Sequence, residues 1–192
     1  MSEARRREAE AQIMAATEDL LAEGNAYAEL SVERIAAAAG RSRTAFYLYF
    51  RDKRELLQRL TETVAGELYG IAERWWAAAD ARAELRPVTE SILATFRRHA
   101  DLLRAVIETS TYDQGMAEFW RGLVGRFVEA TQERLRRDGV DPATAEGMAF
   151  ALVWMTERAC YQHVTNGHGL SDGRLVDALV EIWEGVLSRT GR

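Results

Sequence analysis

The chain has 192 residues, of which 47% are hydrophobic, and a formal net charge of −5 at pH 7. This length and composition allow either one sizeable core or a small domain beside a larger one. The single cysteine, Cys160, excludes an intrachain disulfide framework and fits a reducing cytoplasm. The N-terminus lacks the apolar segment of a signal peptide, and the longest apolar run, residues 148–155, is too short to span a bilayer. We therefore expect a soluble cytoplasmic protein.

Good helix formers dominate the chain, and no stretch alternates apolar and polar residues long enough to indicate a strand. We predict an all-α fold whose first helix covers residues 3–23, with Ile13, Ala16 and Leu20 on one face. Two interpretations stay open for the arginines that precede this apolar stripe. They form either a solvated terminus or a basic arm that reaches DNA, and they are Arg5, Arg6 and Arg7.

Residues 31–50 predict a helix-turn-helix. Ser31 is a suitable N-cap for a short helix, and Gly40 can adopt the positive φ that ends such a helix tightly. Ser42 then caps a second helix, on which Phe46 and Phe50 share a face that we assign to the core. Two short helices joined by a tight turn form the motif whose second helix enters the DNA major groove.

A long helix follows the motif. Asp52 and Glu55 have the spacing of a capping box, and the helix is expected to continue toward Ala79. Residues 41–59 hold six basic and two acidic side chains, whereas the chain from residue 61 onward carries a net charge of −5. A small basic face on an acidic body is typical of a DNA reader with a separate second domain.

Five more helices are predicted, which brings the total to nine. Pro87 is placed in the first turn of the fifth helix, after a connector at residues 77–85. The remaining predicted ranges are 101–110, 116–138, 142–165 and 172–187.

Several short motifs in the first third of the chain together resemble the N-terminal signature of the TetR family of transcriptional regulators. They are IAxxAG at residues 35–40, Ser42-Arg43, FYxYF at residues 46–50 and DKxxL at residues 52–56. The resemblance implies a DNA-binding head at residues 1–54, with its recognition helix after Gly40. It also implies an effector-binding and dimerisation body at residues 55–192, with the fourth helix connecting the two.

The resemblance also implies which residues contact double-stranded operator DNA. Position by position these are Ser31, Ser42, Arg43, Thr44, Tyr47, Tyr49 and Lys53, and we add Arg41. The side-chain chemistry agrees, because an arginine can bond both acceptors of a guanine and hydroxyls can reach phosphates. Three residues depart from the family pattern, so the base preference must be the protein's own: Arg41, Ala45 and Leu48.

The body holds all five tryptophans. Aromatic side chains in a helical body are core by default, but a small-molecule pocket is also built from aromatics with few polar groups. Segments at residues 117–120, 155–161 and 175–183 resemble the ethionamide-resistance repressor subgroup of the TetR family, which implies a hydrophobic effector. The candidate lining residues are Phe96, Trp120, Val124, Phe127, Met148, Leu152, Thr156, Tyr161 and Trp183. Glu157, on the same stretch, should either pair with an arginine or lie at the mouth.

The last two helices are apolar on more than one face, which favours a homodimer through a four-helix interface, as the family resemblance also implies. Metal binding by Cys160, His163 and His168 is conceivable, but a fourth ligand is missing, so we predict no metal and no cofactor. No enzyme motif is present. An alternative that stays open is a purely structural dimer that binds DNA and has no effector.

Overall fold

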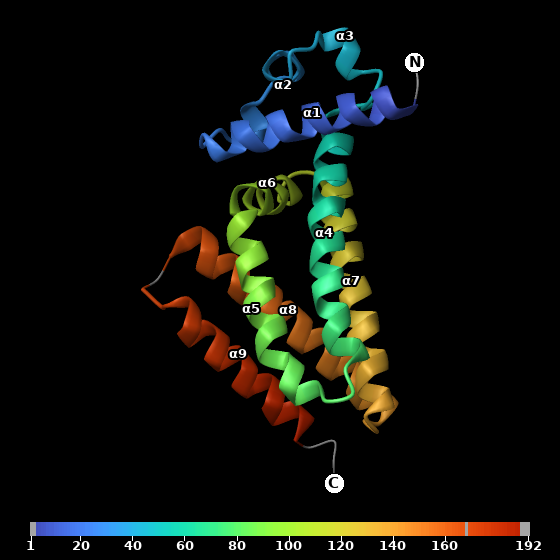
Figure 1. The fold of residues 1–192 in the computed structure, drawn as a ribbon, viewed down its shortest axis with the longest axis vertical. Helices are drawn as coiled ribbons and strands as arrows, with labels where there is room; N and C mark the ends of the chain where they lie inside the picture. Colours follow the sequence, from blue (N-terminus) through green and yellow to red (C-terminus); the bar gives the residue numbers. More distant parts are fainter. Residues whose placement is uncertain (1–2, 168, 189–192) are drawn as a thin grey trace. The chain divides into compact units, whose positions relative to one another are not determined.

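In the computed structural model, residues 3–167 and 169–188 are described, and within them every regular element is helical. This confirms the all-α prediction with nine α-helices, which Figure 1 labels. The elements are α1 Glu3–Ala22, the 3-10 helix η1 Tyr27–Glu29, α2 Val32–Ala38, α3 Arg43–Phe46, α4 Lys53–Ala77, α5 Ala81–Arg98, α6 Ala100–Ser110, α7 Gln114–Arg137, α8 Pro142–Asn166 and α9 Asp172–Leu187.

The chain forms two compact units. The first contains the described residues up to Thr63 together with Asp101–Trp120, and the second contains Val64–Ala100 and the described residues from Arg121 onward. Both α4 and α7 contribute residues to each unit. The domain boundary between residues 54 and 55 stays a prediction.

The first unit has its core where α1 packs on α2 and α2 packs on α3. Ile13, Ile35 and Phe46 are completely buried there. α3 is shorter than predicted, because the chain leaves the helix after Phe46 and turns. Phe50 still lies beneath it, with its ring centroid 5.5 Å from that of Phe46. The predicted core role of both phenylalanines is therefore confirmed.

The start of α4 differs from a standard capping box. The backbone N–H of Glu55 donates to the Asp52 carboxylate at 2.8 Å, as predicted. The Glu55 carboxylate, however, accepts from the backbone N–H of Arg51 at 2.8 Å rather than from that of Asp52. Glu55 thus binds the backbone N–H one residue before the N–H that a capping box would bind.

α5 begins at Ala81, so the prediction that Pro87 lies in its first turn is wrong. The Asp80 carboxylate accepts from the backbone N–H groups of Arg82 and Ala83, at 3.0 and 3.1 Å, and this satisfies two donors at the new start. The burial of Leu85 also stabilises this first part of α5. These contributions offset the one hydrogen bond that Pro87 cannot donate inside the helix.

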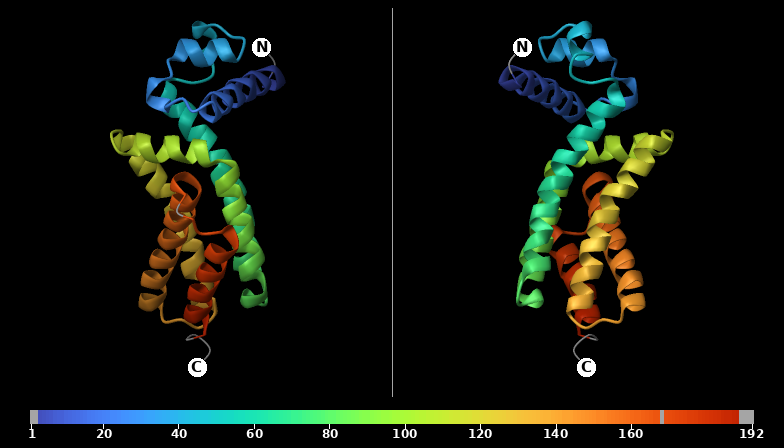
Figure 2. Two further views of the ribbon diagram at one scale, coloured as in Figure 1. Left: turned by 90° about the vertical axis from the view of Figure 1, so that its left-hand side faces the viewer. Right: turned by 90° about the vertical axis from the view of Figure 1, so that its right-hand side faces the viewer.

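In the second unit, α8 and α9 run side by side and both pack on α5 (Figure 2). Asp172, at the start of α9, binds the side chains of His163 from α8 and Arg97 from α5. One carboxylate therefore connects three helices. In the described part of the chain, no helix is long and apolar enough to cross a membrane.

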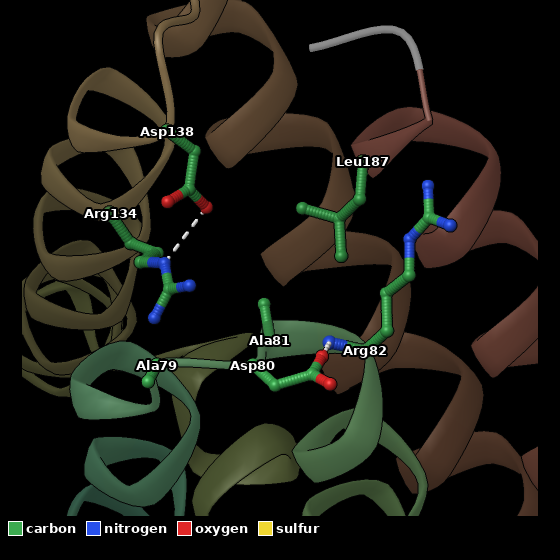
Figure 3. Close-up of a pocket in the computed structure, with 7 residues that line it drawn as sticks. All are labelled: Ala79, Asp80, Ala81, Arg82, Arg134, Asp138 and Leu187. Atoms are coloured by element: carbon green, nitrogen blue, oxygen red, sulfur yellow. Dashed lines mark hydrogen bonds and ion pairs between the residues drawn. The ribbon is translucent and has the colours of Figure 1, made fainter. Parts of the chain in front are cut away.

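The C-terminal end of α4 is closed by a buried arginine. Nη1 of Arg134 donates to the backbone carbonyls of Trp75, Trp76 and Ala78 at 2.9, 3.0 and 2.6 Å. Its Nε donates to the Asp138 carboxylate at 2.8 Å, a pair visible in Figure 3. The last carbonyls of a helix lack partners within the helix, and a cation is the group best suited to them.

We expect Arg134→Met to lower the free energy of unfolding by about 3 kcal/mol, because it removes three hydrogen bonds to backbone carbonyls and the donor to the Asp138 carboxylate. Urea unfolding followed by circular dichroism measures this. Arg136→Met, at an exposed position two residues along α7, is the matched control and should change stability by less than about 0.5 kcal/mol. Equal effects of the two substitutions would contradict the role given to Arg134.

Candidate functional site

Two serines and one glycine set the geometry of the helix-turn-helix. The Ser31 hydroxyl accepts from the backbone N–H of Arg34, and the Ser42 hydroxyl accepts from that of Ala45, both at 3.1 Å. Gly40, between the helices, has a φ of +65°. The predicted caps and turn are therefore confirmed. Each serine still has its hydroxyl proton to donate to another acceptor.

Arg43 stands on the exposed side of α3, where it contacts two side chains. Its Nη1 lies 2.6 Å from the Glu33 carboxylate of α2. Its guanidinium carbon lies 5.8 Å from the centre of the Tyr47 ring. These contacts direct the guanidinium along the exposed face of the motif. Sequence reasoning missed Glu33, because the pairing crosses the turn and follows no helical spacing.

The predicted DNA-contact residues differ in how exposed they are in the structure. Ser42, Arg43, Thr44 and Tyr47 are all exposed on or next to α3. Tyr49 is only 6% exposed and packs in the core of the first unit, so its burial leaves little of the side chain for DNA. Arg41 is half-buried, and its Nη2 donates to the Gln12 side chain at 2.6 Å. Leu48, one of the departures from the family pattern, is exposed beside Tyr47.

Lys53 and Tyr27 form a reciprocal pair. The Lys53 ammonium donates to the backbone carbonyls of Tyr27 and Ala28 at 2.7 and 3.2 Å, and the Tyr27 hydroxyl donates to the carbonyl of Lys53. Partial burial lowers the pKa of Lys53. The ammonium has three donors, so one is left for a phosphate. Lys53 therefore joins η1 to the start of α4 in addition to its predicted role at DNA.

The second unit brings together three of the predicted ligand-lining residues. The indole N–H of Trp183 on α9 donates to the Thr156 hydroxyl of α8 at 3.0 Å. That hydroxyl donates in turn to the Leu152 carbonyl at 2.8 Å. The ring of Trp75 meets that of Trp183 edge to face, with centroids 5.1 Å apart. α4 and α9 thus meet through a pair of tryptophan rings, and α8 joins them through the Thr156 hydroxyl.

Phe127 belongs to another aromatic cluster. Its ring centroid lies 5.4 Å from that of Tyr69 and 5.9 Å from that of Trp76. The Trp76 indole N–H donates to the hydroxyl of Thr131 at 3.1 Å. Sequence reasoning left Tyr69 and Trp76 out of the lining, although their seven-residue spacing places them on one face of α4.

The other predicted lining residues have varied surroundings. Phe96, Val124, Leu152 and Tyr161 are buried, and Met148 is half-buried. Trp120 belongs to the first unit, and its place in the lining stays a prediction. Its buried indole N–H has no hydrogen-bond partner in residues 3–167 and 169–188.

A separate hollow of about 470 Å³ lies at the end of the second unit (Figure 3). It is open and polar, and it contains none of the predicted lining residues. Its walls are Ala79, Asp80, Ala81, Arg82, Arg134, Asp138 and Leu187. Arg134 and one carboxylate oxygen of Asp80 cap helices, so these groups already have partners within the fold.

Cys160 and His163 are the two candidate metal ligands that the structure describes. Among the described residues, no three histidine, cysteine or acidic side chains lie close enough together to hold a metal ion. Cys160 is buried, and His163 bonds Asp172 at 2.8 Å. His168 lies outside the described residues.

Comparison with known proteins agrees with this geometry. Residues 13–60 match the family described as bacterial regulatory proteins, tetR family, and residues 85–187 match the family described as transcriptional regulator EthR, C-terminal domain. The chain therefore belongs to the TetR family of transcriptional regulators, which are not enzymes. Within that family its body is EthR-like. It is 31% identical to the HTH-type transcriptional regulator EthR of Mycolicibacterium smegmatis over 183 residues, which cover 91% of this chain and 83% of that protein.

Solved structures show the same fold. The Bacillus subtilis regulator FadR, in complex with stearoyl-CoA, aligns with a TM-score of 0.69 at 20% identity, over 89% of this chain and 95% of FadR. A Saccharomonospora viridis protein in complex with choline aligns with a TM-score of 0.73 at 21% identity, over 93% of this chain and 96% of that one.

The Glu55 carboxylate should make the stability of the first unit depend on pH. The backbone N–H of Arg51, followed by the side chains of Arg51 and Arg59, holds the pKa of Glu55 below its ordinary value. A carboxyl whose pKa is lower in the folded state stabilises that state above its ordinary pKa of about 4.3, and the contribution is lost as the pH falls through the folded pKa.

We therefore expect Glu55→Gln to lower the melting temperature at pH 7, with the difference from wild type shrinking near pH ~3. Thermal melts at both pH values measure this. Glu62→Gln, at an exposed position on α4, is the control and should leave the profile unchanged. A Glu55→Gln deficit that is as large in acid as at neutral pH would contradict the expectation.

Proposed function

We propose that the protein is a ligand-responsive transcriptional repressor that binds a near-palindromic operator as a dimer and is released by a hydrophobic small molecule. The observation that carries the DNA-binding part is the exposed face of α3. There Arg43 and Tyr47 project from a helix whose opposite side, at Phe46, is completely buried. Because operators lie in the cytoplasm of bacteria, this function also places the protein there.

Arg43 is the residue proposed to read a base. A guanidinium can bond O6 and N7 of guanine together, which is the commonest specific contact in the major groove. Glu33 holds Arg43 in the free protein, so the guanine must replace this carboxylate as the partner. Ser31, Ser42, Thr44 and Lys53 are proposed to contact phosphates, which fix the position of the recognition helix without reading sequence.

The proposed dimer uses α8 and α9. Phe150 on α8 is 59% exposed and Ile182 on α9 is 47% exposed, which is unusual for large apolar side chains on two neighbouring helices. A second copy across a two-fold axis would bury both. Such a dimer presents two recognition helices to successive major grooves, about 34–36 Å apart.

The effector site is proposed among the aromatic side chains of the body. Two structural neighbours hold stearoyl-CoA and choline, which supports a small-molecule site in this fold. Binding can release DNA only if the ligand favours one arrangement of the heads over another. α4 is the element proposed to carry that difference, because it contributes residues to both units.

Arg43→Ala and Lys53→Ala should weaken DNA binding in different ways. The first should reduce discrimination between operator variants by about 1–3 kcal/mol, because it removes a base contact. The second should weaken binding to all sequences alike, because it removes a phosphate contact. It should also reduce, by about one, the magnitude of the slope of the logarithm of the binding constant against the logarithm of the salt concentration.

Gel shifts with DNA flanking the protein's own gene, repeated at several salt concentrations, measure both effects. Arg121→Ala, on the exposed surface of α7, is the control and should bind like the wild type. Binding by the wild type that ignores sequence and salt would refute the regulator function. An exchange of the two variant phenotypes would reverse the assigned roles.

Phe150→Glu should convert the dimer to a monomer and weaken operator binding, because it places two charges in the proposed interface. Light scattering coupled to size exclusion measures the mass. Tyr112→Glu changes a side chain that is 64% exposed but lies between α6 and α7, and it should leave the mass unchanged. A Phe150→Glu protein that remains dimeric would rule out this interface.

A further inference from the structure

The carboxylate of Glu157 is buried without hydrogen bonds. The residue lies on α8 and is 7% exposed, and neither Oε1 nor Oε2 has a hydrogen-bond partner in the described part of the chain. The nearest cation is Arg158, whose Nε is 3.6 Å from Oε2, beyond hydrogen-bond range. The Arg158 guanidinium lies over the ring of Tyr161 instead, 5.2 Å from its centroid.

Two other acidic side chains of the second unit do have hydrogen-bond partners. Asp172 accepts from Arg97 and His163, and Glu67 accepts from Arg98 at 2.7 Å, and both lie where water also reaches them. A buried carboxylate without such partners is costly when ionised. Burial accordingly raises the pKa of Glu157 above its ordinary value.

Beside Arg158, whose charge acts on Glu157 without a hydrogen bond, two neighbouring groups on α8 supply neither a donor nor a positive charge. Cys160 lies one helical turn further along α8, and burial together with the charge of Glu157 raises the pKa of its thiol to about 12. Thr156, the preceding residue, has already donated its proton to the Leu152 carbonyl. Because Glu157 is only 7% exposed, its carboxylate is shielded from solvent on a helix that packs against α5 and α9.

The surroundings would favour a positive charge brought by a ligand. Thr156, which accepts from the Trp183 indole, precedes Glu157 on α8, and Tyr161, whose ring lies under the Arg158 guanidinium, is one turn further along. Aromatic faces attract cations, and a cation in a desolvated site gains most from an opposite charge. A ligand that combines a cation with an apolar part would therefore gain from the Glu157 carboxylate and from the apolar side chains that keep water away from it.

We propose that the effector is a cationic amphiphile, an amine or quaternary ammonium compound with an apolar remainder, whose charge pairs with Glu157. This inference rests on the ligand site of the proposed function and specifies the chemistry of its ligand. The competing explanation is that Glu157 is a permanently protonated core residue, in which case the charge of a ligand makes no difference.

The test compares octylamine, octanol and octanoate, which share an apolar chain and differ in head-group charge. Each is titrated at pH 7 into the full-length protein bound to a DNA fragment, and the shift in melting temperature is recorded in parallel. Octylamine should bind wild type about tenfold or more tighter than octanol, with octanoate weakest. In Glu157→Gln the advantage of octylamine over octanol should fall to within about twofold.

Two further variants make the comparison specific. Glu157→Asp keeps the charge and should keep the preference for octylamine, whereas Glu181→Gln neutralises an exposed acid on α9 and should bind all three compounds as wild type does. DNA binding by each variant confirms that it is folded.

The outcomes separate the inference from the function on which it rests. Octanol binding as tightly as octylamine to wild type, or an unchanged preference in a folded Glu157→Gln protein, would overturn the cationic effector and leave the hydrophobic site in place. The wild-type comparison decides this even if Glu157→Gln does not fold. Binding of none of the three compounds would overturn both.

Discussion

The exposed surface of α3, the proposed DNA-reading surface, depends on the burial of one phenylalanine. α3 contains four residues, one turn, and a helix of that length has no stability of its own in water. Phe46 is completely buried beneath it, and Phe50 is packed against Phe46. The exposed side chains of this turn are therefore held in place by what lies under them. Any substitution that loosens Phe46 would disturb the direction of Arg43 without touching it.

Cations bind backbone carbonyls at element ends in both units, and each of these cations lies near one end of α4. Lys53 binds the carbonyls of Tyr27 and Ala28 where α4 begins, and Arg134 binds three carbonyls where it ends. Carbonyls left over at element ends need donors from elsewhere in the fold, and both side chains supply several donors at once. Lys53, the only lysine of the chain, thus stabilises the fold in addition to its proposed contact with DNA.

Sequence reasoning succeeded where the determining contact is local. The Ser31 and Ser42 caps each involve an N–H three residues away, and Gly40 needs only its own φ, so all three could be predicted. It failed at Pro87, where the tendency of proline to begin helices was outweighed by the two hydrogen bonds of Asp80.

In the candidate site, too, local features could be predicted from the sequence and contacts between helices could not. The exposure of Tyr47 and the burial of Tyr49 result from the turn after α3, which the helical period does not describe. The pairing of Arg43 with Glu33 crosses between helices, and that of Thr156 with Trp183 joins residues 27 positions apart. Such contacts are set by tertiary packing, so the residue types could be predicted but the partners could not.

The hydrogen bonds of Thr156 determine what the predicted ligand site can recognise. The hydroxyl proton is committed to Leu152 and one lone pair to the Trp183 indole, so the oxygen retains a single lone pair. A molecule that arrives here meets an acceptor and no donor. A ligand carbonyl would find nothing to bond at Thr156 unless an internal hydrogen bond first broke, whereas an N–H or O–H group could bond at once. A threonine that looks neutral in sequence therefore selects for ligands that donate.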